Sequence, residues 1–235
     1  MSEPSQATCI VGMHRSGTSC LTGLLQQRGL VLGKHYQWNR FNQRGNRENQ
    51  DFLDINSALL EANGGDWRQP PRKLRWDESL ERWARKLCET FPADQPWGFK
   101  DPRSLLVLEF WDVLIPGLQT VGVFRHPLAV IRSLLRREGT ALGEEQALAL
   151  WCHYNRLLLQ RYRQQPFPLL CFDWDRERFL AAVDEAASQL GLSATAPGDS
   201  FYDGGLIHFQ AVGEQGLRGE ALAIYRELVE VSAAP

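Results

Sequence analysis

The chain has 235 residues, of which 43% are hydrophobic and 23% are charged, and its formal net charge is −2. This length can bury a substantial core, so we expect one α/β domain over residues 1–235. A net charge this close to zero does not indicate nucleic acid or an anionic membrane as a partner. No apolar run is as long as a membrane span, and the polar start of the chain lacks the order of a signal peptide. We therefore expect a cytoplasmic location and a flexible N-terminus over residues 1–6.

Cysteines are scattered along the chain and form no C-x-x-C pair. Their odd number and mostly apolar neighbours indicate reduced, structural thiols. We therefore expect neither zinc nor any other bound metal. The five are Cys9, Cys20, Cys88, Cys152 and Cys171.

Hydrophobic periodicity divides the first part of the chain into one short buried strand and three helices. Two polar stretches, Gly29–Gln50 and Trp67–Arg75, are predicted to be irregular or loop segments. In chain order, the predicted elements are a strand over Ala7–Val11, a helix reaching about Arg28, and helices over Asp51–Glu61 and Glu78–Glu89.

Three more apolar runs predict strands, and a helical pattern follows each of them. Ser104 is predicted to cap one of these helices, and Pro127 suits the first turn of another. In order, we expect strand Trp97–Lys100, a helix from Ser104 through Trp111, strand Thr120–Phe124, helices from Pro127 to about Arg137 and from about Glu144 to Arg163, strand Pro168–Phe172, and helix Glu177–Leu190.

Strands that alternate with helices predict a parallel sheet flanked on both faces, as a three-layer α/β/α domain. Such sheets bind ligands at the carboxyl ends of their strands. The chemically suggestive segments, His14–Ser19, Lys100–Arg103 and Arg125, all lie at the carboxyl ends of predicted strands. We expect them to meet at one edge of the sheet.

The segment Gly12–Ser19 lies between the first strand and the first helix. A glycine-bearing turn at a helix N-terminus directs backbone N–H groups and partial positive charge at one point, which suits a phosphate-like anion. The Gly12-x-x-x-x-Gly17 spacing matches a nucleotide-triphosphate P-loop, but Thr18 stands where that loop has its lysine. Arg15 is the cation instead, which indicates an anionic donor other than ATP.

A second anion site is indicated by Arg125, at a strand end, and Ser133, in the helix that Pro127 opens. Ala129 and Ser133 are i, i+4 neighbours beside the apolar stripe of that helix. A small residue and a hydroxyl close to an arginine leave room for another phosphate.

From Cys9 to about Leu192 the sequence resembles the sulfotransferases that use 3′-phosphoadenosine 5′-phosphosulfate (PAPS), through three motifs in the family's order. The resemblance implies a P-loop-type sulfotransferase fold, and the segment 193–235 matches it poorly. It implies that Arg125 and Ser133 hold the 3′-phosphate and that Lys100 belongs to the lysine-bearing segment Lys100-Asp-Pro-Arg103. The 5′-phosphosulfate would be held by Arg15, Ser16, Gly17, Thr18 and Ser19.

Two departures separate the chain from phenol and steroid sulfotransferases and bring it closer to the carbohydrate and tyrosyl-protein branches. Arg15 replaces the lysine of the first loop, and Pro102 stands where those enzymes have a catalytic histidine. The carbohydrate and tyrosyl-protein branches use a carboxylate downstream of the first helix. Glu48 occupies that region and is our first candidate for the base, with Asp101 in reserve. With Glu48, we assign Lys100 and Arg15 to catalysis.

The resemblance implies metal-independent, in-line transfer of a sulfuryl group from PAPS to a hydroxyl or, less often, an amine, leaving 3′,5′-adenosine bisphosphate. The acceptor class stays open among small molecules, glycans and peptides. Two other functions remain alternatives at this point: a P-loop kinase or NTPase with a degenerate loop, and a non-catalytic nucleotide-binding module.

Overall fold

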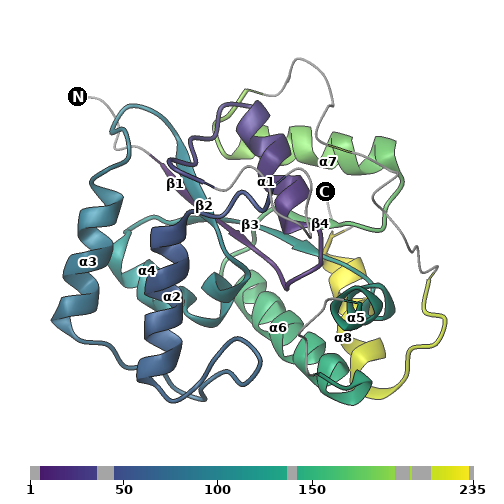
Figure 1. The fold of residues 1–235 in the computed structure, drawn as a ribbon. Coiled ribbons are helices and arrows are strands. Elements are labelled where there is room, and N and C mark those ends of the chain that lie inside the picture. Colours follow the sequence, from purple (N-terminus) through teal and green to yellow (C-terminus); the bar gives the residue numbers. More distant parts are fainter. Residues whose placement is uncertain (1–5, 36–44, 137–141, 194–201, 203–212, 233–235) are drawn as a thin grey trace.

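The computed structural model of the chain describes residues 6–35, 45–136, 142–193, 202 and 213–232. Within them, four parallel strands form one sheet in the order β2-β1-β3-β4 (Figure 1). The register pairs Ile10 with Lys100 on one side of the central strand and with Val121 on the other. The strands are β1 (Ala7–Val11), β2 (Trp97–Lys100), β3 (Gln119–Phe124) and β4 (Leu169–Cys171).

Helices cover both faces of this sheet, which confirms the predicted three-layer α/β/α arrangement (Figure 1). Helices α1 (Thr18–Gln27) and α7 (Arg176–Gln189) pack on one face. The opposite layer contains α2 (Gln50–Ala62), α3 (Glu78–Cys88), α4 (Leu108–Leu114), α5 (Pro127–Leu135), α6 (Glu144–Gln164) and α8 (Gly219–Ser232).

The central strand β1 is buried along its whole length, which explains why it reads as an uninterrupted apolar run. Its side chains alternate between the two faces. Ile10 joins Leu21 and Leu24 of α1 in one core cluster, whereas Cys9 and Val11 belong to the cluster on the other face. Because β1 is packed on both faces, the position of its C-terminal end, where the next loop begins, is fixed within the sheet.

The helix predicted from Ser104 is divided in two. A 3-10 turn, η1 (Pro102–Leu106), precedes α4, and Val107 stands before α4 without a capping side-chain hydrogen bond. The prediction that Ser104 caps this helix is wrong, because its Oγ instead accepts a hydrogen bond from Asn56 Nδ2 at 2.9 Å. Asp101 caps η1 by accepting a hydrogen bond from the Arg103 backbone N–H.

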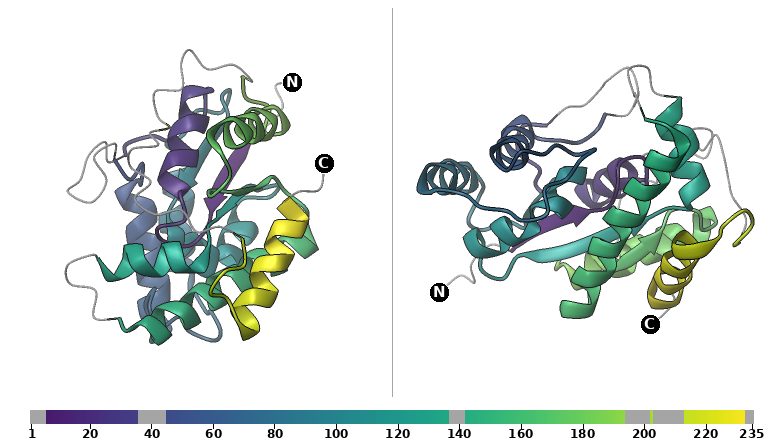
Figure 2. Two further views of the ribbon diagram at one scale, coloured as in Figure 1. Left: turned by 90° about the vertical axis from the view of Figure 1, so that its right-hand side faces the viewer. Right: turned by 90° about the horizontal axis from the view of Figure 1, so that it is seen from below.

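Helix α8 was not predicted, although four of its buried residues follow helical spacing: Ala221, Ile224, Tyr225 and Leu228. It packs against α6 and β4, the last strand of the sheet (Figure 2). Helix α8, which belongs to the poorly matched segment 193–235, is therefore held in place by two elements that precede it in the chain.

Some sequence predictions fall on residues outside the described ranges. The predicted flexible N-terminus is described only at Gln6, and residues 36–44 of the irregular stretch Gly29–Gln50 are not described. None of the described helices combines the length and apolar content that crossing a membrane requires.

Candidate functional site

The loop after β1 has a backbone that only glycine accommodates at two points. Gly12 has φ 151°, and a Cβ there would lie 2.3 Å from the Val123 carbonyl oxygen. Gly17, with φ 93°, stands at the N-cap of α1, so the first backbone N–H groups of the helix follow it directly. Arg15 is also left-handed, with φ 70°. The loop therefore combines a helix N-terminus with an arginine held in a strained conformation.

Hydroxyl side chains line the same loop. The Ser16 hydroxyl is buried and makes no hydrogen bond within the described part of the chain. Thr18 is buried as well, and its carbonyl oxygen accepts a hydrogen bond from Thr22 Oγ1 at 2.7 Å, whereas Ser19 is half-buried. A buried hydroxyl without a partner is costly unless a ligand or water satisfies it. Ser16 thus marks a polar position suited to an anionic group.

Arg15 connects the loop to the helix after β3. Its Nε donates a hydrogen bond to Ser133 Oγ at 2.8 Å, although 118 residues separate the two in sequence. From the sequence, these two residues were expected at opposite ends of the nucleotide. The structure places them in direct contact, so the two predicted anion sites adjoin.

Arg125 follows β3 and is held by the residues that follow β4. Its Nε donates to Asp173 Oδ1 at 3.3 Å, and its guanidinium carbon lies 5.3 Å from the centre of the Phe172 ring. Both charged side chains are at least nine-tenths buried. The Arg125 carbonyl accepts a hydrogen bond from the Trp151 indole N–H at 3.1 Å, which ties this strand end to α6.

Glu48 and Lys100 form a buried ion pair at the end of β2. Lys100 Nζ donates to Glu48 Oε1 at 2.7 Å, and the two side chains are 2% and 11% exposed. Asn46 Nδ2 donates to the other carboxylate oxygen, Oε2, at 3.2 Å. The structure thus brings the first candidate base into contact with the predicted lysine, and both carboxylate oxygens are engaged by donors.

Asp101, the reserve candidate, lies in a separate network. It is fully buried and accepts hydrogen bonds from Asn56 Nδ2 at 2.9 Å and from Arg103 Nε at 3.1 Å. Burial raises the pKa of its carboxyl, while the neighbouring Arg103 guanidinium opposes that shift. Asn56 also accepts a hydrogen bond from the Trp111 indole. This set of contacts gives Asp101 a role in joining α2, η1 and α4.

His14, in the same loop, packs against aromatic residues. Its ring centre lies 4.6 Å from that of Trp67 and 6.2 Å from that of Tyr154. The Tyr154 hydroxyl donates to the Trp67 carbonyl oxygen at 3.4 Å. The loop containing Trp67 therefore contacts His14, in the loop after β1, on one side and Tyr154 of α6 on the other.

A cavity of about 560 Å³ opens beside that attachment. Residues on both sides of Trp67 line it, together with one face of the N-terminal half of α6. Its polar lining comprises Asp66, Arg68, Gln69, Gln146 and His153, and its apolar lining comprises Pro70, Leu142, Ala149 and Leu150. Burial and the nearby Arg156 lower the pKa of His153, which favours the neutral imidazole. Arg68 is paired with Asp66 at 3.1 Å, so the charges in the lining balance.

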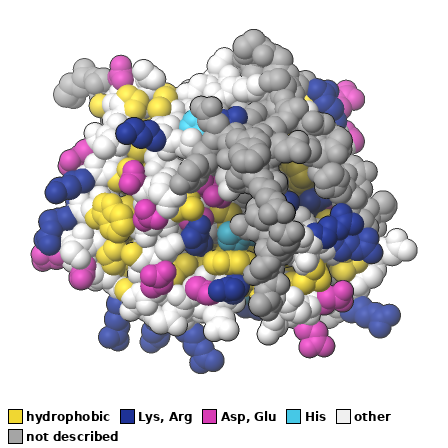
Figure 3. Space-filling view, viewed as in Figure 1, with side chains coloured by type: hydrophobic (Ala, Val, Ile, Leu, Met, Phe, Trp, Pro, Cys, Tyr) yellow, Lys and Arg dark blue, Asp and Glu magenta, His cyan; other side chains and the backbone are white. Residues whose placement is uncertain are grey.

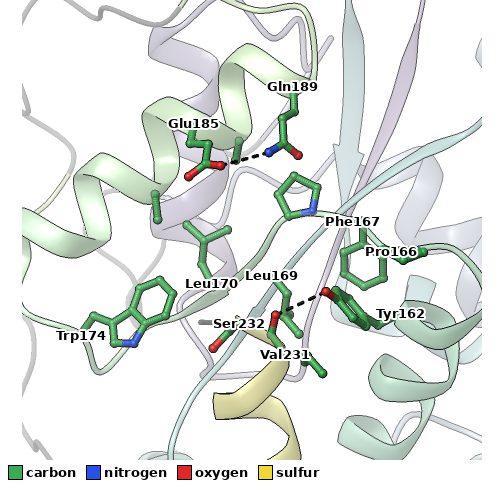
Figure 4. Close-up of a pocket in the computed structure, with 13 residues that line it drawn as sticks. Tyr162, Pro166, Phe167, Leu169, Leu170, Trp174, Glu185, Gln189, Val231 and Ser232 are labelled. Carbon is green, nitrogen blue, oxygen red and sulfur yellow. Dashed lines mark hydrogen bonds between the residues drawn. The ribbon is translucent and has the colours of Figure 1, made fainter. Parts of the chain in front are cut away.

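A second, smaller cavity of about 200 Å³ runs alongside β4 (Figure 4). Leu169, Trp174, Tyr162 and Gln189 are among its lining residues, and none of the predicted site residues lines it. Among the described residues, no group of three or more His, Cys, Asp and Glu side chains is arranged to hold a metal ion. On the face shown in Figure 3, acidic and basic side chains lie interspersed over α2 and α3.

Comparison with solved structures decides the fold. The sulfotransferase domain of the Synechococcus PCC 7002 olefin synthase is similar over 100% of this chain and 97% of its own, with a TM-score of 0.53 and 16% identity. The chain has the sulfotransferase fold. The sulfotransferase STF1 from Mycobacterium tuberculosis H37Rv has a TM-score of 0.42 and 15% identity, over 98% of this chain and 77% of that one. No protein-family model and no curated protein matches the sequence.

Within this sulfotransferase fold, the structure adds residues that the sequence analysis missed. Asp173 and Phe172 contact Arg125, and Asn46 contacts Glu48. A signal for the first two was present, because the last predicted strand ends at Phe172 and Asp173 directly follows it, so both belong to the same edge of the sheet. Nothing in the sequence alone identified which cation the aspartate would meet.

Proposed function

We propose that this protein is a sulfotransferase that moves a sulfuryl group from PAPS to a hydroxyl or, less often, an amine. The hydrogen bond between Arg15 and Ser133 carries this proposal. It joins a loop that lacks the lysine of an NTP-binding P-loop to a helix that begins beside Arg125. One nucleotide with anionic groups at both its 5′ and 3′ positions fits such adjoining sites better than ATP does.

The residues present fit the donor. Gly17 and Thr18 offer backbone N–H groups at the start of α1, and the buried Ser16 hydroxyl lacks a partner within the described residues. These would hold the 5′-phosphosulfate together with Arg15 and Ser19. Arg125 and Ser133 would hold the 3′-phosphate. When bound, PAPS supplies a sulfuryl group whose bond to the nucleotide phosphate breaks as the acceptor oxygen bonds to sulfur.

Glu48 is the base in this proposal. A hydroxyl that attacks sulfur must lose its proton, and a positioned carboxylate contributes about 10²- to 10⁴-fold to such a step. Lys100 and Asn46 fix the Glu48 carboxylate from both oxygens. The Asp101 side chain is completely buried, whereas that of Glu48 keeps 11% exposure, so accessibility favours Glu48 as the group that takes the proton.

Lys100 and Arg15 are the cations that would stabilise charge during transfer. Negative charge grows on the oxygen that leaves with the nucleotide, and fixed cations in a buried site stabilise it without reorganisation. Lys100 is almost fully buried, and Arg15 is held in place by Ser133. These two cations take the place that magnesium occupies in phosphoryl transfer, so we propose that activity persists in EDTA.

The cavity beside Trp67 is our candidate for the acceptor site. It shares the loop that contacts His14, and its lining contains no unbalanced charge. A charged acceptor there would meet an arginine and an aspartate that are already paired with each other. An acceptor that is uncharged in the part the cavity encloses fits this lining.

Two measurements test the proposal. Calorimetric binding of 3′,5′-adenosine bisphosphate should be much tighter than binding of ATP, and sulfate from labelled PAPS should appear in an acceptor panel in the presence of EDTA. Preferential binding of ATP with magnesium would favour the kinase alternative instead. Tight binding of the bisphosphate without transfer to any acceptor class would leave a non-catalytic nucleotide-binding module.

A further inference from the structure

Two residues that follow β4, Phe172 and Asp173, contact the Arg125 guanidinium at its face and at its edge. Strands β3 and β4 are parallel neighbours with Phe124 opposite Cys171, so the residues that follow them, Arg125 and Phe172, emerge side by side. The Phe172 N–H donates to the Phe124 carbonyl at 2.9 Å, which extends the pairing to this point. The register of the sheet therefore places the aromatic ring next to the guanidinium.

Phe172 packs against the face of that guanidinium and also contacts the loop between β1 and α1. The guanidinium carbon lies 5.3 Å from the ring centre, within the range of a cation–π contact. A Cβ at Gly17 would lie 2.3 Å from Phe172 Cδ2, so the ring rests directly on the glycine at the N-cap of α1. The Phe172 ring therefore contacts both the Arg125 guanidinium and Gly17.

Asp173 holds the edge of the same guanidinium. Its Oδ1 accepts from Arg125 Nε at 3.3 Å, and its Oδ2 accepts from the His126 backbone N–H at 2.6 Å. His126 is the N-cap of α5, the helix that contains Ser133. The carboxylate therefore fixes both Arg125 and the start of the helix that contains Ser133.

We propose that Phe172 and Asp173, here called the Arg125 clamp, are positioning residues that orient Arg125 toward the 3′-phosphate of the nucleotide. This inference rests on the proposed function. Arginine binds phosphate through a planar fork whose orientation sets the geometry of two parallel hydrogen bonds. Asp173 engages the Nε edge of the Arg125 guanidinium, and Phe172 packs against one of its faces. These two contacts fix the direction in which the Nη edge points.

A purely structural role for the clamp would affect every nucleotide alike. Orientation of Arg125 instead concerns one group of the ligand, the 3′-phosphate. The informative quantity is therefore the ratio of the affinities for 3′,5′-adenosine bisphosphate and AMP, since AMP lacks that phosphate. A change in overall stability leaves this ratio unchanged.

The test compares Asp173→Asn with wild type by calorimetry on the full chain. The amide keeps an oxygen for the His126 N–H but loses the charge-assisted bond to Arg125, so we expect the ratio to fall about tenfold. Phe172→Leu, which removes the ring face, should lower it less. The matched control is Asp112→Asn, which weakens another arginine–aspartate pair, with Arg161 at 2.9 Å, away from the site. Its ratio should equal that of wild type.

An unchanged or increased ratio in folded Asp173→Asn would overturn the clamp. If that variant does not fold, Asp173→Glu provides the same test, because the longer side chain keeps the charge and shifts the guanidinium. Arg125→Ala separates the two levels of the proposal. A wild-type ratio in Arg125→Ala rejects the nucleotide assignment itself. A lowered ratio there, with no further loss on adding Asp173→Asn, supports the clamp.

Discussion

Lys100 donates a hydrogen bond to Glu48 at 2.7 Å between two side chains that are almost entirely buried. The pair joins the end of β2 to the segment before α2, and 52 residues separate the partners in sequence. Breaking a buried pair by removing one partner leaves the other charge uncompensated. A test of Glu48 must therefore keep the shape of the side chain and an oxygen that accepts from Lys100 Nζ.

Glu48→Gln keeps the shape of the side chain and one oxygen that can accept from Lys100 Nζ, and it removes the proton acceptor. Because it also leaves the Lys100 charge without a counter-ion, the unfolding free energy of the variant is measured alongside. We expect turnover to fall by about 10²- to 10⁴-fold, while calorimetric affinity for 3′,5′-adenosine bisphosphate stays near the wild-type value. Glu61→Gln, an exposed position on α2, is the control and should remain fully active. Full activity of Glu48→Gln would move the base to another residue, with Asp101 the next to test.

Filling the cavity beside Trp67 should affect the acceptor and not the nucleotide. Ala149 lines this cavity from an exposed position on α6, so Ala149→Phe can be accommodated without disturbing the core. We expect KM for the acceptor to rise at least about tenfold, the scale of binding lost when a pocket changes by more than one methylene group. Bisphosphate affinity measured by calorimetry should not change.

The control for that substitution is Ala182→Phe, which fills the cavity alongside β4. Kinetics like those of wild type are expected from Ala182→Phe. Equal acceptor kinetics in Ala149→Phe and wild type would exclude this cavity as the acceptor site.

Alanine substitutions at Gly17 and Gly29 distinguish two costs to stability: the strain of a left-handed backbone and the steric contact of an added Cβ. Both have positive φ, 93° and 104°, but a Cβ at Gly17 meets Phe172 whereas a Cβ at Gly29 meets nothing within 4 Å. Gly29→Ala should cost about 1 kcal/mol of unfolding free energy from backbone strain alone. Gly17→Ala should cost at least about 1 kcal/mol more, since overpacking adds to the strain. Urea unfolding measures both, and equal losses would show that Phe172 yields without cost.

Stability below neutral pH should depend on His126. Burial lowers the pKa of its imidazole below the usual value of 6.5, although the nearby Asp173 carboxylate opposes the shift. The unfolded chain therefore binds the proton more readily than the folded chain, so this contribution to stability is present above pH 6.5 and is lost as the pH falls through the lower folded value. The slope is at most about 1.4 kcal/mol per pH unit.

His126→Asn provides the comparison, because asparagine also caps helices well and can accept the Leu128 N–H bond that His126 accepts at 3.2 Å. Unfolding free energies measured from pH 8 to pH 5 should decline more steeply in wild type than in His126→Asn. Parallel curves for the two proteins would assign the acid sensitivity to other groups.

Much of the fold follows from local patterns. The apolar runs of β1, β2 and β3 predicted strands within one residue of their observed bounds, because buried parallel strands need apolar side chains on both faces. One helix was predicted where the structure has η1 and α4, and Ser104 itself gave no sign of this. Its hydroxyl accepts a hydrogen bond from Asn56, 48 residues away, and does not cap the helix. Helix α8 was missed although its spacing was present, and its neighbours are distant elements.

By itself, the sequence determined where strands and helices alternate, which loop lacks a lysine at Thr18, and which charged residues follow strand ends. These features depend on neighbours within a few turns of chain. Only the tertiary structure decided that Arg15 meets Ser133, that Lys100 meets Glu48 and that Asp173 holds Arg125. Those pairs are set by sheet register and by the packing of helices on the sheet, because burial leaves each charge only the partners that the neighbouring strand or helix brings within reach.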